Sequence, residues 1–162
     1  MEQKKICFNE MLQFGKEGER DVAEKLIHLG ANVVPIYQYE SNHAPFLLTN
    51  ANEKLILPDL QCIYSDNIIW VVVKRKQRWI SYQGVLETGC DYINYLQYKK
   101  IADITNIPVF IFFKHEKMAP EGFFYVNITQ RGRAWNGLKS NGEYAHKPMY
   151  FWRYESLIPM IF

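Results

Sequence analysis

The sequence predicts an α/β fold: a mixed sheet with covering helices and a β-rich C-terminal extension. Two segments show the periodicity of amphipathic helices, and the most β-branched run of the chain lies between them. The expected order is helix, three strands, helix, strand. A helix between two strands of one sheet implies a crossover, so parallel and antiparallel pairs should occur together.

The first helix is expected at residues 8–29. Val22 and Leu26 belong to its apolar stripe, and Gly30 is a natural stop. Glu19 lies on the same stripe, whereas the neighbouring acids of this helix are expected on its solvent face.

A strand, a loop and a hairpin are expected next. The strand covers residues 32–39, where Pro35 indicates an edge position or a bulge, and the unpatterned residues 40–54 form a long loop. Strands at 57–64 and 68–76 flank a short polar break. The second of these is apolar enough to lie centrally, buried on both faces.

The second helix is expected at residues 91–105, after a loop that Gly84 and Gly89 indicate. Further strands are expected at 109–113, 123–128 and 149–153.

The composition fits one domain over residues 1–162, with a core at about 8–116 and a C-terminal extension at about 117–162. Three widely spaced cysteines show neither metal-binding nor disulfide spacing, and no apolar run reaches the roughly 20 residues of a membrane helix. We therefore expect an intracellular, cytoplasmic protein. The formal charge of +2 does not by itself indicate a nucleic-acid partner.

Three charged residues stand where burial is costly without a partner. Asp59 begins a strand of apolar and neutral residues, and Lys74 shares a face with Val72 near the end of the most hydrophobic strand. Glu19 on the first helix is the third. Each also has a plain explanation. Asp59 can belong to a turn, Lys74 can extend its ammonium group to water, and Glu19 can be an ordinary surface acid.

A basic and aromatic run follows Lys74. Its candidate nucleic-acid contacts are Arg75, Lys76, Arg78, Trp79 and Tyr82. Basic side chains beside aromatic rings can hold phosphates and stack on bases. A solvated strand edge is the plainer explanation of the same run.

Taken in order, these residues resemble the PD-(D/E)xK nuclease superfamily, close to its Holliday-junction-resolvase-like and restriction-endonuclease-like branch. The matching segments are Gly18-Glu19, Pro58-Asp59, Val72-Val73-Lys74, Thr88-Gly89-Cys90-Asp91 and Asn106-Ile107-Pro108-Val109. The resemblance spans residues 15–113 and leaves the C-terminal tail uncovered. It implies a restriction-endonuclease-like core and a metal-dependent endonuclease that hydrolyses phosphodiester bonds of DNA; a phage or a mobile element is one option for its source.

The resemblance also implies a Mg²⁺ (or Mn²⁺) site. Asp59 and the backbone carbonyl of Val73 would bind the metal, Glu19 would reach it directly or through water, and Lys74 would orient and help to deprotonate the attacking water. Mg²⁺ prefers hard oxygen ligands, polarises the phosphodiester and generates a nucleophile near neutral pH.

Val72 departs from the family pattern, which has Glu or Asp at this position. Valine supplies no oxygen, so we expect weak or absent metal binding, an Asp59–Lys74 salt bridge and an inactive or very weak enzyme. Three explanations stay open: an engineered or clone-selected substitution, natural degeneration, or a shifted register in which Lys76 is the family's lysine.

Two alternatives use the same fold without catalysis, a nucleic-acid-binding module and a protein-interaction module. The aromatic tail at Phe151, Trp152 and Tyr154 suits a protein contact, although core packing is the favoured explanation. DNA is favoured over RNA as partner, and no membrane contact is expected. A homodimer is an option, because nucleases that cut both strands often pair through a two-fold axis.

Overall fold

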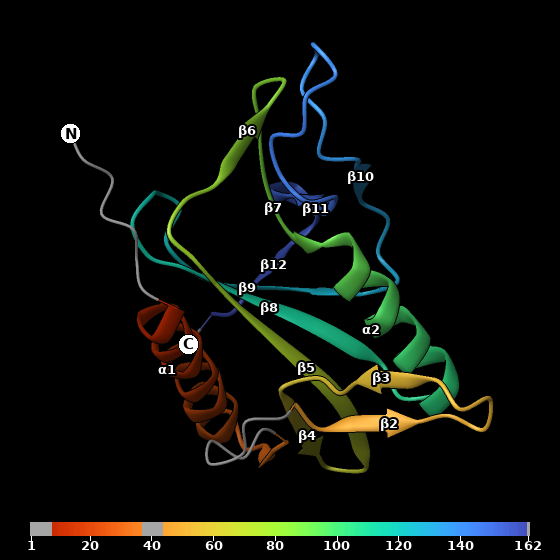
Figure 1. The fold of residues 1–162 in the computed structure, drawn as a ribbon. Helices are drawn as coiled ribbons and strands as arrows, with labels where there is room; N and C mark the ends of the chain where they lie inside the picture. The colour runs from red at the N-terminus through yellow and green to blue at the C-terminus, as the bar shows by residue number, and fades with distance from the viewer. Residues whose placement is uncertain (1–7, 37–43, 162) are drawn as a thin grey trace.

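The main element of the fold is a six-stranded mixed sheet, seen in a computed structural model that describes residues 8–36 and 44–161 (Figure 1). In spatial order its strands are β1 (Asn32–Pro35), β4 (Leu60–Tyr64), β5 (Asn67–Lys76), β8 (Val109–His115), β9 (Gly122–Asn127) and β12 (Ile158–Pro159). β5 pairs parallel with β8, and the other neighbours pair antiparallel. The α/β class and the mixed sheet are therefore confirmed.

Two helices cover opposite faces of this sheet (Figure 1). α1 (Phe8–His28) packs on the face that carries Val71 and Val73, and α2 (Tyr92–Thr105) packs on the face that carries Val72. The alternation along β5 thus buries both of its faces, as its apolar run predicts. In the described ranges, no helix is both long and apolar enough to span a bilayer.

A second, four-stranded sheet contains much of the C-terminal extension. In spatial order its strands are β10 (Arg133–Trp135), β11 (Met149–Arg153), β7 (Val85–Asp91) and β6 (Ile80–Tyr82), and a 3-10 turn at Tyr154–Ser156 leads from β11 toward β12. The expected loop around Gly84 and Gly89 is therefore wrong, because β7 runs through Gly89. Phe151 and Trp152 are buried, so core packing explains the aromatic tail.

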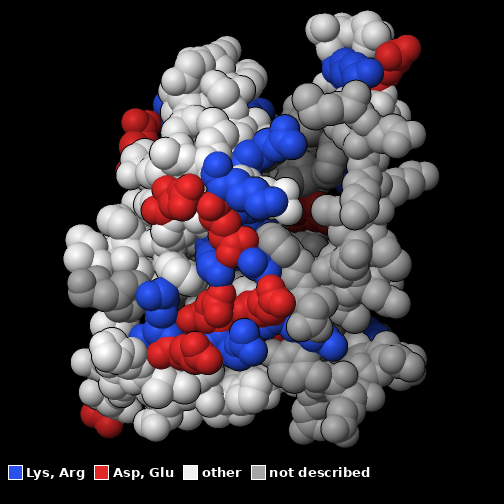
Figure 2. Space-filling view, turned by 90° about the vertical axis from the view of Figure 1, so that its left-hand side faces the viewer, with Lys and Arg blue, Asp and Glu red and all other residues white. Residues whose placement is uncertain are grey.

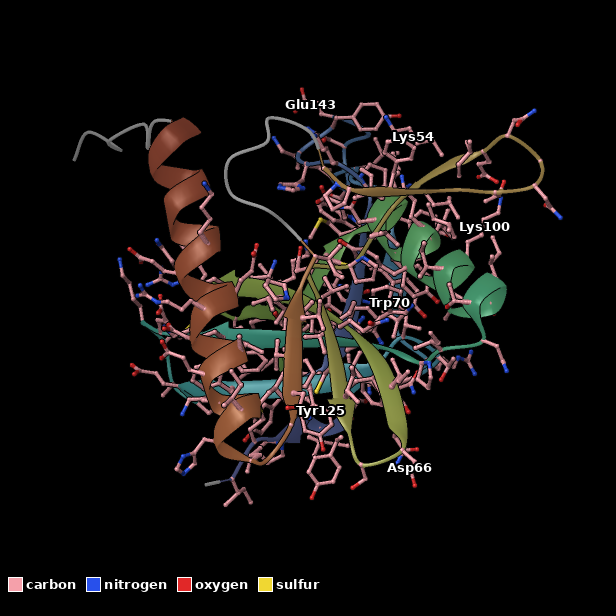
Figure 3. All side chains as sticks on the ribbon, turned by 90° about the horizontal axis from the view of Figure 1, so that it is seen from below. Lys54, Asp66, Trp70, Lys100, Tyr125 and Glu143 are labelled. Carbon is pink, nitrogen blue, oxygen red and sulfur yellow. The ribbon has the colours of Figure 1, made fainter. Side chains whose placement is uncertain are left out.

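A small hairpin covers one side of α2. Its strands are β2 (Phe46–Leu48) and β3 (Lys54–Ile56). The expectation of one long loop at 40–54 is wrong, because residues 46–48 and 54 belong to these two strands. Residues 37–43 lie outside the described residues. The Ile56 N–H donates to the Gln97 side chain at 3.2 Å. Figure 3 shows Lys100 on this hairpin side, and Trp70 in the interior.

Acidic residues of α1 join a cluster of ion pairs instead of facing solvent alone. Glu17 pairs with Arg75 at 2.7 Å, and Asp21 pairs with Lys114. Glu116 bridges both cations, at 2.7 Å from each. Figure 2 shows this face as alternating acidic and basic patches. The expectation that the acids flanking Glu19 are solvent-facing is corrected, since they attach α1 to the ends of β5 and β8.

Candidate functional site

Asp59 lies where the β4–β5 ladder of the main sheet ends, and this end of the ladder is here named the candidate edge. The last paired residues are Leu60 and Val71, and beyond them the Oδ2 atom of Asp59 accepts the Val73 N–H at 2.7 Å. The N–H and C=O of a strand residue point to the same side. The Val73 carbonyl therefore also faces the Asp59 edge, as the resemblance requires.

Asp59 is half-buried, and this environment changes its acidity. Burial raises the pKa of Asp59 above its ordinary 3.8, while the positive charge of Lys74 and the Val73 N–H act in the opposite direction. The expected Asp59–Lys74 salt bridge is not formed: among the described residues no ion pair joins them, and their interaction acts over a longer range.

Lys74 lies instead beside Tyr98 of α2, with its Nζ atom 5.8 Å from the ring centroid. Burial lowers the pKa of Lys74, but Tyr98, Asp59 and Cys90 together raise it above its ordinary 10.5. Burial also raises the pKa of Tyr98 to about 12. Lys74 is thus a cation at neutral pH that can attract a phosphate. Its expected part in deprotonating water gains no support from this pKa.

The acid that the resemblance requires at position 72 is absent, so few oxygen ligands for a metal ion remain at this site. Val72 is 0% exposed within the apolar core. Glu19 is half-buried, lines a groove with Pro35 and Leu60, and is not among the groups that shift the pKa of Asp59.

No cluster of three or more acidic, histidine or cysteine side chains occurs in the part of the chain that the structure describes. Asp59 with one carbonyl supplies only part of the oxygen shell of Mg²⁺, and waters or a substrate phosphate would have to complete it.

Two residues of the basic run have structural partners. Trp79 is 3% exposed, stacks on His115 with ring centroids 3.7 Å apart, and donates its indole N–H to the Pro120 carbonyl at 2.9 Å. It is therefore not placed to stack on a base, which corrects the expectation from its neighbourhood. Arg75 is committed to the ion-pair cluster with Glu17 and Glu116.

Lys76, Arg78 and Tyr82 of the run, together with Arg75, line a pocket of about 640 Å³ between the end of β5 and the second sheet, here named the β6–β11 pocket. Residues on its wall include Lys76, Arg78, Tyr82, Arg133, Trp135 and Phe151. The last three belong to the tail that the resemblance leaves uncovered. Two glycines are the sequence feature that goes with this part of the pocket. A Cβ added at Gly89 or Gly132 would lie within 2.3 Å of a backbone oxygen of β11, so glycine allows the chain to approach β11 closely at both positions.

The fold is similar to those of solved nucleases. No family model matches the chain, and no curated protein matches it in sequence. Hjc, a Holliday junction resolvase from the archaeal hyperthermophile Archaeoglobus fulgidus, has a TM-score of 0.53 at 11% identity, over 88% of this chain and 90% of that chain. A nuclease from a fusselovirus has a TM-score of 0.48 at 12% identity, over 91% and 85%. By the first of these matches, the chain shares the fold of a Holliday junction resolvase.

Proposed function

We propose that this protein binds DNA with a nuclease fold whose metal-dependent hydrolysis of phosphodiester bonds is disabled by Val72. One observation carries the proposal. The Asp59 carboxylate is fixed on the Val73 N–H at 2.7 Å and interacts with the cation of Lys74, while the buried side chain at position 72 supplies no oxygen. The similarity to a resolvase supports DNA as the partner.

The charge of this edge supports binding without cleavage. Burial and the charge of Lys74 lower the pKa of Lys76, so the two ammonium groups disfavour each other in the free protein. A bound phosphate would relieve this repulsion, because its negative charge would attract both ammonium groups. With one carboxylate instead of two, the edge favours the phosphate of a DNA backbone over a bare divalent ion.

The central test restores the acid with Val72→Glu. Nicking of a supercoiled plasmid is measured with Mg²⁺ and with Mn²⁺, and Val72→Gln is the matched control of equal size without charge. We expect nicking at least about tenfold above the unsubstituted protein for Val72→Glu, because even supporting residues of metal sites change affinity by about 10- to 100-fold. Val72→Gln should remain at the background rate.

A second variant and a second readout decide the outcome. Adding Lys74→Ala to Val72→Glu should abolish nicking without unfolding the chain. In addition, Mg²⁺ should raise the Tm of Val72→Glu, since a ligand bound only by the folded state stabilises it. A folded Val72→Glu protein that neither nicks DNA nor gains Tm with Mg²⁺ would remove the metal-site part of the proposal.

DNA binding by the unsubstituted protein separates this proposal from a protein-interaction module. Phosphate contacts release counterions, so the affinity should fall steeply between low and physiological salt. Fluorescence anisotropy with a labelled oligonucleotide measures this directly. Absence of salt-sensitive binding to any DNA would favour the interaction module instead.

A further inference from the structure

The β6–β11 pocket is lined by aromatic and basic side chains. Its volume of about 640 Å³ falls within the usual range for small-molecule sites. Tyr82, Trp135 and Phe151 contribute aromatic rings from three different strands. None of the described residues that line it is acidic. The pocket therefore suits an occupant with a flat apolar part and a negatively charged part.

One cation of the lining, Arg133, is matched by an acidic partner. Arg133 reaches into this region, but its Nε and Nη2 atoms bond the carboxylate of Glu87, with the shorter contact at 2.5 Å. Glu87 is 1% exposed, whereas the Arg133 side chain is 29% exposed and borders the pocket. The Arg133 guanidinium also lies 3.9 Å from the Tyr82 ring centroid. The aromatic part of the wall thus offers flat stacking surfaces to a neutral group, and the paired Arg133 adds little attraction for an anion.

Two further cations of the lining have no acidic partner among the described residues. Lys76 and Arg78 line the pocket, and neither forms an ion pair with another residue in the described ranges. Arg78 is exposed. Two unpaired cations beside aromatic rings match a nucleotide, whose base is neutral and flat and whose phosphate is anionic.

Trp135 has the ring best placed to receive a base. It is half-buried, its indole N–H donates to the Leu138 carbonyl at 3.1 Å, and its nearest described ring is Phe151, tilted by 38° at 6.4 Å. No described ring lies parallel to it. Trp135 is therefore anchored by its edge and keeps a face for stacking.

We infer that the β6–β11 pocket holds an unpaired base of a DNA strand whose phosphates lie on Lys76 and Arg78. This inference rests on the proposed function and names its substrate class. A base reaches such a pocket only when it is outside a duplex stack. The protein should therefore select DNA with unpaired nucleotides over fully paired duplex.

The pocket is also close to the candidate edge. Lys76 lies two residues after Lys74 on the same face of β5, a separation of roughly 7 Å along a strand. Neighbouring phosphates of one DNA strand can span such a distance. A base in the pocket would thus place an adjacent phosphate near Lys74 and Asp59, at the point where the acid-restored variant is expected to cut.

The test compares three labelled DNAs in EDTA: a paired duplex, the same duplex with a central unpaired bulge, and a single strand. We expect the bulged and single-stranded DNAs to bind about tenfold more tightly than the duplex, because stacking a base on an aromatic side chain gives effects of this size. A 2-aminopurine placed in the bulge should change its fluorescence on binding. This readout reports on the unpaired base without a protein variant.

Variants assign the preference to the pocket. Trp135→Ala should remove the preference for unpaired DNA while leaving duplex affinity unchanged, and Trp135→Phe should keep most of it. Tyr64→Ala is the matched control, since Tyr64 is 55% exposed at the end of β4 and outside the pocket. Circular dichroism checks that each variant is folded.

The outcomes separate the two proposals. Salt-sensitive DNA binding without preference for unpaired DNA, or a preference that survives Trp135→Ala, would overturn the pocket inference alone. Absence of any DNA binding would overturn the proposed function with it. Tighter binding of the matching RNA strand than of single-stranded DNA would overturn the assignment of DNA as the substrate class.

Discussion

His115 is a buried titratable residue that the candidate edge does not use. Its ring stacks on Trp79, and its Nε2 atom lies 3.1 Å from the Thr88 hydroxyl. Its Nδ1 atom is the one buried side-chain polar atom without a partner in the described part of the chain. Burial and the charge of Lys76 lower the pKa of His115 to about 4.

This residue should make the protein sensitive to acid. The imidazole titrates near 6.5 in the unfolded chain and near 4 in the folded one, so between these values only the unfolded chain binds the proton. The free energy of unfolding should therefore fall by roughly 3 kcal/mol as the pH drops from about 6.5 to about 4. Denaturant unfolding at several pH values measures the effect.

His115→Phe is the control for that prediction. Phenylalanine keeps a ring for Trp79 but cannot bind a proton, so its stability should depend less on pH across the same interval. Other groups, Asp59 among them, titrate equally in both proteins and cancel in the comparison. Parallel pH profiles of the two proteins would show that His115 does not carry the effect.

At the residue scale, strand alternation predicted that Val72 and Lys74 lie on one face of β5, because residues two apart in a strand share a face. It could not predict the partners of Trp79 or Arg75. Their partners lie on elements tens of residues away, and a basic, aromatic run looks the same whether its rings face a base or the core. The role of Lys74 as a cation also depends on Tyr98, which α2 supplies.

At the scale of elements, β7 connects the candidate edge to the pocket. It pairs with β11 from Glu87–Arg153 to Asp91–Met149, and it carries Cys90 toward Lys74. Gly89 lies at the centre of this pairing. Any Cβ there would be 2.1 Å from the Tyr150 carbonyl oxygen, a backbone atom that cannot move aside alone.

Gly89→Ala should therefore lower the free energy of unfolding by at least about 3 kcal/mol, the upper part of the usual cost of overpacking. Gly84→Ala is the matched control: Gly84 has a φ of +77° and open space around it, so only backbone strain of about 1 kcal/mol is expected. Guanidinium unfolding measures both. Equal losses for the two variants would contradict the close approach of β7 and β11.

The elements that could be predicted are the long ones. α1, α2, β5 and β8 have periodicities that extend over many residues, and their expected ranges agree closely with the observed ones. β2, β3, β6 and β10 are three residues each, too short to show a pattern. β7 was not predicted because Gly89 in a sequence usually indicates a turn. In the sheet, Gly89 is needed because β11 lies too close for a side chain.

At the scale of the whole molecule, the net charge of +2 conceals two distinct arrangements. On the α1 face, the cluster around Arg75, Lys114 and Glu116 balances its charges internally (Figure 2). At the β6–β11 pocket, Lys76 and Arg78 have no acidic neighbour on the wall. Composition alone cannot separate charges that hold the fold together from charges that are available to a ligand.

Two arginines of one sequence run should therefore behave oppositely. Arg75→Gln leaves Glu17 and Glu116 without their shared partner, so it should lower the free energy of unfolding by about 1–3 kcal/mol, the usual cost of losing hydrogen bonds to charged groups, with DNA affinity unchanged. Arg78→Gln should leave stability within about 0.5 kcal/mol and reduce the slope of log affinity against log salt by about 1. Thermal unfolding and salt-dependent anisotropy measure both quantities for each variant. A loss of salt dependence in Arg75→Gln would show that this pocket-lining arginine also contacts DNA, and an unchanged slope in Arg78→Gln would contradict the phosphate contact assigned to Arg78.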